Sequence, residues 1–213
     1  MDVVVAGGHG KIGLMLLQLL AREGHRARGL IRNPDHAGEL EQAGAEPVIC
    51  DLEAEEAVAP FVAGAGAIVF AAGAGPGSGP ERKRTMDLGG ALKLIEAARS
   101  DGIARYVMVS AMGAAHPEQS SEQMRPYIEA KAEADRGLAA SGLDYTIVRP
   151  GGLTDDPGTG QVSLAEELGR GLVPRDDVAA VLLAVLGAGN TIGKAFDLVE
   201  GETSVDEAVR SLD

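Results

Sequence analysis

Short apolar runs rich in β-branched residues alternate along the chain with segments whose apolar residues recur at helical spacing. The first run, residues 2–6 (DVVVA), ends in a glycine cluster and is typical of a buried strand in a parallel sheet. The next segment gathers its apolar residues on one side and stops at Gly24, which predicts a helix. Further strands are predicted at residues 26–31, 46–50, 67–70, 106–110, 145–148 and 195–199. Further helices are predicted to begin at Pro34 and to span residues 53–59, 82–99, 126–140, 176–186 and 205–212.

This alternation of strands and helices indicates repeated strand–helix–strand units, and hence a parallel sheet with helices on both faces. We therefore expect a single doubly wound α/β domain. No internal repeat, charged tail or linker divides the sequence. Sheets of this kind bind ligands beyond the carboxyl ends of their strands, so the residues that follow each strand are the first candidates for a site.

Glycine content and net charge narrow the class of partner. Glycine makes up 30 of 213 residues, about 14% against a usual ~7%, without the three-residue period of collagen. This enrichment favours binding loops in which the backbone approaches a ligand. Nineteen basic and 32 acidic residues give a net charge of −13. Because such a field repels a phosphate backbone, a small-molecule substrate is expected and nucleic acid is not.

The number and spacing of the cysteine and histidine residues indicate that the protein has neither an internal disulfide nor a metal site. Cys50 is the single cysteine and is expected to be a small buried residue, and the four histidines are scattered. The N-terminus lacks a basic segment followed by an apolar stretch, and no run of 18 apolar residues occurs. We therefore expect a cytoplasmic protein that makes no membrane contact.

A glycine-rich turn follows the first predicted strand, with the spacing G-x-x-G-x-x-G. Gly7 permits a tight turn, Gly10 lets the backbone approach a pyrophosphate, and Gly13 lets the helix pack on the strand. The diphosphate would lie at the N-terminus of the helix. Because the motif follows a strand and opens a helix, a dinucleotide site is favoured over a purely structural turn. The residues assigned to it are Gly7, His9, Gly10, Lys11, Ile12 and Gly13.

The end of the second strand indicates which dinucleotide binds. NAD sites carry an acid about 20 residues after the motif, where it holds the ribose 2′-hydroxyl. Here that position is Arg32, followed by Asn33. An arginine offers a fork of donors to a 2′-phosphate, so NADP(H) is expected ahead of NAD(H). The alternative is a solvated arginine at a strand end.

Two further strand ends fit the same ligand. Asp51 would bond the adenine amino group and Leu52 would cover the ring, although Asp51 equally suits the N-cap of the predicted helix. After the fourth strand, Ala71, Ala72 and Gly73 are small enough to let a dinucleotide lie flat against the backbone. The alternative for these three residues is tight packing.

Together with Ser110, residues 127–131 (YIEAK) and residues 143–160 (LDYTIVRPGGLTDDPGTG), these segments resemble the atypical short-chain dehydrogenases/reductases of the NmrA-like, flavin-reductase-like group. The resemblance spans most of the chain up to residue 160, and residues 143–160 are its most specific part. It implies one Rossmann-type domain over residues 1–213, with small substrate-side elements from about residue 151. It also implies that NADP binds at the glycine loop, with the nicotinamide end lined by Pro150, Gly151, Gly152 and Leu153.

The resemblance also implies three catalytic residues. Tyr127 and Lys131 are four residues apart on a predicted helix and so share one face. In the family, such a tyrosine gives a proton to a carbonyl oxygen. The lysine holds ribose hydroxyls, which places it in the cofactor site as well, and its charge lowers the pKa of the phenol. Ser110, at the end of the fifth strand, would hydrogen-bond the same oxygen. A Y-x-x-x-K pattern also arises by chance, so a structural role for the pair remains open.

The chain departs from the family in ways that bear on its substrate. The nearest match to the active-site asparagine of typical members is Asp87, for which an exposed helix acid is the alternative. Only about 60 residues follow Pro150, too few for the substrate-binding domain of extended relatives. We expect a shallow site with Met112 and Met124 as apolar contacts, formed by loops 74–80, 111–126 and 151–160.

These features favour an NADP(H)-dependent oxidoreductase, a monomer or homodimer, that transfers hydride to a small carbonyl, quinone-like or flavin-like substrate. The second hypothesis is a non-catalytic NADP(H)-binding sensor that reports redox state to a protein partner. The set Ser110, Tyr127 and Lys131 favours the enzyme, because a sensor has no need of it. A sugar-nucleotide epimerase or dehydratase would need more substrate-binding chain.

Overall fold

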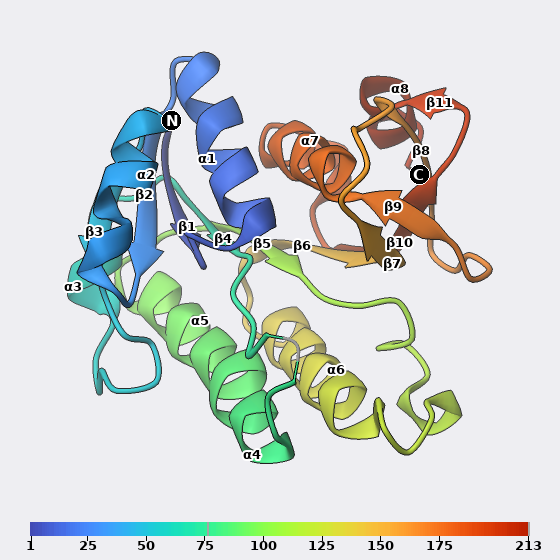
Figure 1. The fold of residues 1–213 in the computed structure, drawn as a ribbon, viewed down its shortest axis with the longest axis horizontal. Helices are drawn as coiled ribbons and strands as arrows, with labels where there is room; N and C mark the ends of the chain where they lie inside the picture. Colours follow the sequence, from blue (N-terminus) through green and yellow to red (C-terminus); the bar gives the residue numbers. More distant parts are fainter. Residues whose placement is uncertain (76, 213) are drawn as a thin grey trace.

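The computed structural model describes residues 1–75 and 77–212, and in them nine strands form one sheet in the order β11-β8-β10-β6-β5-β4-β1-β2-β3 (Figure 1). The predicted doubly wound α/β fold is confirmed. The sheet is parallel from β10 to β3, and the order reverses at β1 as in a Rossmann fold. Its parallel strands are β1 (Asp2–Ala6), β2 (Arg26–Ile31), β3 (Glu46–Ile49), β4 (Ala67–Phe70), β5 (Arg105–Val109), β6 (Asp144–Pro150) and β10 (Lys194–Glu200).

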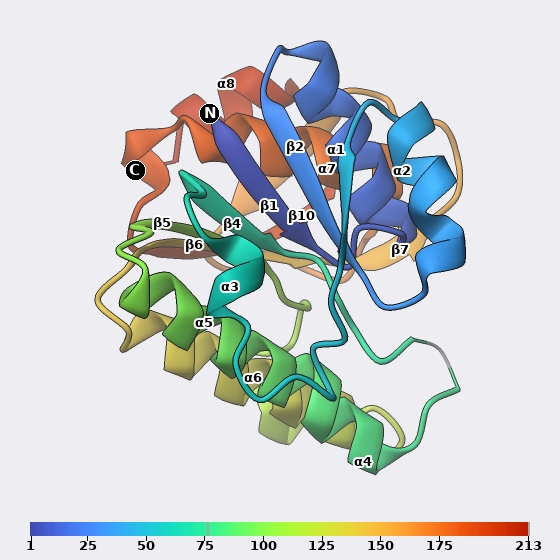
Figure 2. The same ribbon diagram turned by 90° about the vertical axis from the view of Figure 1, so that its left-hand side faces the viewer.

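Helices cover both faces of the sheet (Figures 1 and 2). One face carries α1 (Lys11–Arg22), α7 (Arg175–Leu186) and α8 (Val205–Arg210). The other carries α3 (Ala59–Val62), α5 (Ala91–Ser100) and α6 (Arg125–Ala139). Shorter helices are α2 (Ala37–Gln42), α4 (Pro80–Arg82), η1 (Pro34–His36), η3 (Pro117–Gln119), η4 (Gly189–Thr191) and the π-helix η2 (Lys83–Gly90). None of the helices in the described ranges is long and apolar enough to span a bilayer.

The central strands are buried on both faces, which explains why they contain continuous apolar runs. In β1, Val3 and Val5 pack in the core beneath α1 and α7, whereas Val4 and Ala6 pack beneath α5. Successive strand residues point to opposite faces, so one run of five residues supplies both cores. This packing holds the carboxyl end of β1 rigidly in the middle of the sheet.

The predicted helix at residues 53–59 is wrong, because this stretch forms turns and only α3 follows it, at Ala59–Val62. The Lys93 ammonium on α5 explains the difference. It donates to the backbone carbonyls of Leu52 (2.9 Å), Glu53 (3.2 Å) and Glu55 (2.6 Å), which a helix would use within its own ladder. The loop after β3 is therefore fixed to α5.

Four short strands in the C-terminal third were not predicted from the sequence. The strands β7 (Gly152–Thr154) and β9 (Leu172–Pro174) form a separate small parallel sheet. The strand β8 (Gln161–Ala165) runs antiparallel to β10, and β11 (Thr203–Ser204) pairs with β8. They are too short, and too exposed on one side, to show a clear apolar run.

Candidate functional site

The segments predicted to form the site all lie at the carboxyl edge of the parallel sheet. Because β1 to β6 are parallel, the residues that follow them emerge at the same edge. The structure brings together there the glycine loop, Arg32 and Asn33 after β2, Asp51 and Leu52 after β3, Ala71–Gly73 after β4, Ser110 after β5, and Pro150–Leu153 at the end of β6.

The glycine loop, residues 7–13, can adopt its tight turn only because Gly7 and Gly13 carry no side chain. Gly7 has φ +80°, and a Cβ there would lie 2.8 Å from the Cα of Ala72. A Cβ on Gly13 would overlap the carbonyl oxygen of Gly7. The Gly10 N–H donates to that same oxygen (2.8 Å) and closes the turn. These glycines are required by the turn itself and by the close approach of the backbone after β4.

The N-terminus of α1 is suited to a diphosphate. Gly10 is its N-cap and offers no side-chain cap, and its first turn holds no acidic residue. The first N–H groups of a twelve-residue helix are thus left to an external anion, which the helix dipole favours. The loop and this helix end therefore fit a dinucleotide.

Gly8 is a necessary residue that the motif did not single out. A Cβ there would lie 2.9 Å from the Cα of Gly29 on β2, and the Gly8 N–H donates to the carbonyl of Leu30 (3.0 Å). The glycine at position 29, inside a strand, was the available signal, because a glycine in a strand interior often marks a close backbone approach.

His9, Lys11 and Ile12 make contacts within the protein. The His9 ring stacks on that of His36 with centroids 3.5 Å apart. The Lys11 ammonium lies 2.6 Å from Asp155, which Arg175 also contacts at 2.6 Å. This ion pair joins the glycine loop to the loop after β7. Ile12 is partly buried and packs against the core.

We expect Gly13→Ala to weaken NADPH binding about tenfold or more, because the added Cβ would displace the Gly7 carbonyl and open the turn. Fluorescence titration with NADPH measures the change. Gly38→Ala is the matched control, since a Cβ at that position on α2 meets no atom within 4 Å. Equal affinities of the two variants would contradict the assignment of this loop.

The residues predicted to bind the adenosine half of the dinucleotide differ in their exposure and in the contacts that they already make. Arg32 has 58% of its side chain exposed and lies 3.7 Å from Glu53. The Asn33 side-chain oxygen accepts the Asp35 N–H and caps η1. Asp51 accepts the Glu53 N–H (3.0 Å) and thus caps a turn, not the helix whose N-cap was the alternative predicted for it. Leu52 is buried in the core, so little of its side chain is exposed to cover a ring.

The two segments expected to flank the dinucleotide are held by backbone contacts. Ala71 and Ala72 back directly on Gly7, and Gly73 is exposed. After β6, the Gly151 N–H donates to Leu198, and the Gly152 N–H donates to Gly171, both at 2.9 Å. A Cβ on Gly151 would overlap the carbonyl oxygen of Gly171, so this glycine allows β7 to lie beside β9. Pro150 is buried and Leu153 is exposed.

Tyr127 and Lys131 are neighbours on α6, as their spacing predicted. The Lys131 ammonium lies 5.9 Å from the centroid of the Tyr127 ring and 5.5 Å from that of Phe70. It donates to the carbonyl of Val109 at the end of β5 (3.0 Å). Only 4% of the lysine side chain is exposed. Lys131 is therefore buried against the sheet at the edge where the strand ends meet, and the half-buried Tyr127 lies beside it.

Asp87 is not an exposed helix acid. Its side chain is 1% exposed on the π-helix η2, and Oδ1 lies 3.4 Å from the Lys131 ammonium. Its Oδ2 accepts the Ala74 N–H (3.2 Å), and a Cβ on Gly73 would lie 3.1 Å from Oδ1. π-Helical segments are frequent at functional sites. Asp87 thus joins the loop after β4 to the buried lysine and balances its charge.

The expectation that Lys131 lowers the pKa of Tyr127 is only partly met. Burial raises the pKa of the phenol and is the largest contribution. Lys131 lowers it, but Asp87 and Asp135 raise it again, so the net shift is upward. Tyr127 accordingly keeps its proton throughout the neutral range.

Ser110 is present at the end of β5 but is covered. The residue is 2% exposed, so its hydroxyl is buried at the end of the strand. Asp135, also buried, accepts a hydrogen bond from Arg149 Nε (2.9 Å). Burial raises the pKa of Asp135, while Ser110 and Arg149 oppose the rise. A contact between the Ser110 hydroxyl and a substrate oxygen stays a prediction.

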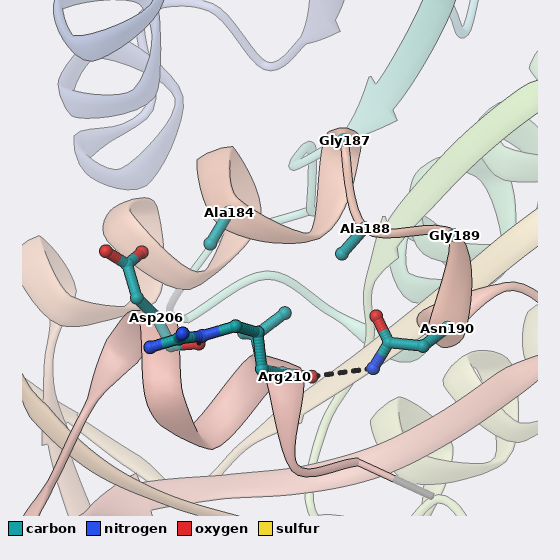
Figure 3. Close-up of a pocket in the computed structure, with 8 residues that line it drawn as sticks. Ala184, Gly187, Ala188, Gly189, Asn190, Asp206 and Arg210 are labelled. Carbon is teal, nitrogen blue, oxygen red and sulfur yellow. Dashed lines mark hydrogen bonds between the residues drawn. The ribbon is translucent and has the colours of Figure 1, made fainter.

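The loops predicted to form the substrate side lie around this edge. Of the two methionines, Met124 is exposed and Met112 is half-buried. The contact of His116 with Glu167 (2.6 Å) connects loop 111–126 to the segment before β9. In loop 74–80, Pro76 lies outside the described residues. Two surface hollows of about 630 and 600 Å³ lie at the opposite edge of the sheet, and the first is lined by α7, α8 and the turn that follows α7 (Figure 3). Neither contains a predicted site residue.

Comparison with known proteins gives consistent matches. The profile of a family described as NAD(P)H-binding matches residues 7–188. A Bacillus subtilis (strain 168) protein named "Uncharacterized sugar epimerase YhfK" is 45% identical over 214 residues, with all of both chains covered. A Bacillus halodurans structure, named provisionally as an NAD-dependent epimerase/dehydratase, is 38% identical with a TM-score of 0.96 and full coverage of both chains. The anaerobillin reductase ChuY from Escherichia coli O157:H7 is 27% identical with a TM-score of 0.80, over 96% of this chain and 99% of that one.

Proposed function

The chain belongs to the NAD(P)H-binding family of Rossmann-fold proteins, and we propose that it is an NADP(H)-dependent oxidoreductase acting on a small carbonyl, quinone-like or flavin-like substrate. One observation carries the proposal. The glycine loop and the Tyr127–Lys131 pair lie at the same edge of the sheet and are joined through Asp87 and the loop after β4. This arrangement supports a role for Tyr127 as a proton donor beside the segments that would hold the dinucleotide.

Each group in the site has a definite task in the proposed reaction. The bound dinucleotide would supply the hydride from its nicotinamide ring. The N-terminus of α1 binds the diphosphate, and the small residues 71–73 leave its path open. Tyr127, protonated at neutral pH, gives its proton to the substrate oxygen as the hydride reaches the carbon. Lys131 holds the cofactor ribose, and Asp87 fixes the position of its ammonium.

The preference for NADP(H) rests on Arg32. Its guanidinium follows β2 at the edge of the sheet and is largely exposed, so it is free to turn toward a 2′-phosphate. A planar fork of donors suits phosphate better than hydroxyl.

We expect Arg32→Glu to weaken NADPH binding about 100-fold while changing NADH binding only slightly, because one charge-assisted pair is replaced by repulsion. The dissociation constants of NADPH and NADH, measured for the wild type and the variant, test this expectation. Arg99→Glu, an exposed arginine near the end of α5, is the matched control. Equal losses for NADPH and NADH would remove Arg32 from the phosphate-binding role.

Two other candidates each have an observation in their favour. The covered hydroxyl of Ser110 and the balanced charge of Lys131 suit a sensor that binds NADP(H) without turnover. The names of the two Bacillus proteins suggest an NAD-dependent epimerase. The similarity to a reductase over 96% of the chain supports the oxidoreductase, because it shows that this length of chain can carry such chemistry.

The proposal is tested by NADPH and NADH binding, followed by NADPH oxidation with flavins, quinones, simple carbonyls and sugar nucleotides. Turnover with one of the first three classes establishes the oxidoreductase. Interconversion of a sugar nucleotide without net NADPH consumption establishes the epimerase instead. Tight binding without reaction on any of them favours the sensor, and no binding of either dinucleotide overturns all three functions.

A further inference from the structure

A compact cluster of charges lies beside the adenosine side of the proposed site. The Glu53 carboxylate, after β3, accepts from both Nε and Nη2 of Arg82 at 3.1 Å each. It also accepts the Thr85 hydroxyl on η2 (2.6 Å). The Arg32 guanidinium approaches the same carboxylate oxygen as Arg82, at 3.7 Å. In Figure 2 the loop between β3 and α3 extends across the end of α5 toward α4. The last residue of α4 is Arg82.

The three charged side chains are held to different degrees. Arg82 is fully engaged, because its Nη1 also donates to the carbonyl of Ala74 (3.1 Å). Glu53 is fixed from behind by the contact of Lys93 with its backbone carbonyl. Burial would raise the pKa of Glu53, but the hydrogen bonds from Thr85 and Arg82 outweigh it and lower the pKa below its ordinary value. Arg32, mostly exposed, is held only loosely.

The cluster places an ionised carboxylate where an arginine would bind a phosphate. A 2′-phosphate drawn to Arg32 would approach Glu53 as a like charge and compete with it for both guanidinium groups. A ribose 2′-hydroxyl carries no charge and meets no such opposition.

We propose that Glu53 limits the preference for a 2′-phosphorylated dinucleotide by occupying Arg32 and Arg82, and that Arg82 is a second phosphate-binding cation once Glu53 is neutral. The proposal rests on the proposed function, since it concerns the same dinucleotide site. It assigns to α4 a residue that neither the glycine motif nor the end of β2 indicated. The chemistry recognised is a phosphomonoester on the ribose.

The test compares NADPH, NADH and the probe pair 2′,5′-ADP and ADP by calorimetry. Glu53→Gln keeps an oxygen that can accept from Thr85 and Arg82 but removes the charge. We expect it to bind NADPH and 2′,5′-ADP about tenfold more tightly, as removal of one nearby like charge predicts. Affinity for NADH and ADP should stay within about twofold. Adding Arg82→Gln should cancel the gain.

Glu55→Gln, two residues along the same loop, is the matched control and should change neither affinity. Thermal melting checks that each variant is folded, and Glu53→Ala must give the same direction of change. Unaltered NADPH affinity in both Glu53 variants would overturn the proposal. A loss of NADH affinity would also overturn it, because Glu53 would then be a ligand of the ribose hydroxyl. A wild-type protein that binds neither dinucleotide would instead refute the proposed function.

Discussion

Replacing Tyr127 with phenylalanine should lower turnover by ~10²–10⁴-fold, the usual contribution of a positioned proton donor. Affinity for NADPH should remain nearly unchanged, because the ring that packs beneath Lys83 and Lys131 is retained. Steady-state rates with the substrate found in the panel, together with NADPH titration, measure the two effects separately. Tyr145→Phe, on β6, is the matched control.

The pH dependence of turnover adds a second readout to this experiment. The pKa of Tyr127 is raised by burial, so the protonated phenol persists as pH rises and is lost only above its ordinary value of ~10. Wild-type activity should therefore show no decline from phenol ionisation between neutral pH and that value. An unchanged rate in Tyr127→Phe would show that the proton comes from another group.

Replacing Lys131 with methionine should lower the free energy of unfolding by about 3–5 kcal/mol, because it leaves the buried Asp87 carboxylate without its counter-ion. Urea unfolding measures the loss. The double variant with Asp87→Asn should recover most of it, since both charges are then removed together.

Lys83→Met is the matched control for this loss. The Lys83 ammonium donates to the carbonyl of Gly75 in an exposed hydrogen bond and lies over the Tyr127 ring, so its replacement should change stability by no more than about 1 kcal/mol. If Lys131→Met lowered the free energy of unfolding no more than this control does, the ion pair with Asp87 would not contribute to stability.

The elements whose signal lies within one segment were predictable. The β-branched runs of β1, β2 and β4 and the glycine turn before α1 need only local information, because burial on both faces demands apolar runs and a tight turn demands glycine. The position of Arg32 at the sheet edge followed from the same count. The spacing of Tyr127 and Lys131 likewise predicted a shared helix face.

The sequence was wrong or silent where a distant segment decided the outcome. The acidic stretch 53–59 has the composition of a helix, but the Lys93 ammonium, on α5, hydrogen-bonds the backbone carbonyls at its start, which a helix would need for its own hydrogen bonds. Asp87 sits in a long helix whose π-helical segment could not be foreseen from apolar spacing, and this segment is where the acid is buried. Gly151 revealed its role only when β9 was placed beside it.

The sequence by itself determined the α/β alternation, the glycine turn before α1 and the residues that follow each strand, because local periodicity and backbone freedom are properties of contiguous residues. The tertiary structure alone decided which charges meet. Glu53 and Arg82 are 29 residues apart, and Asp87 reaches Lys131 from a different helix. Ion pairing depends on where separate segments meet in space, so it cannot be read from contiguous residues. Only the folded chain shows that Asp87 balances the charge of Lys131 and that Glu53 pairs with both Arg32 and Arg82.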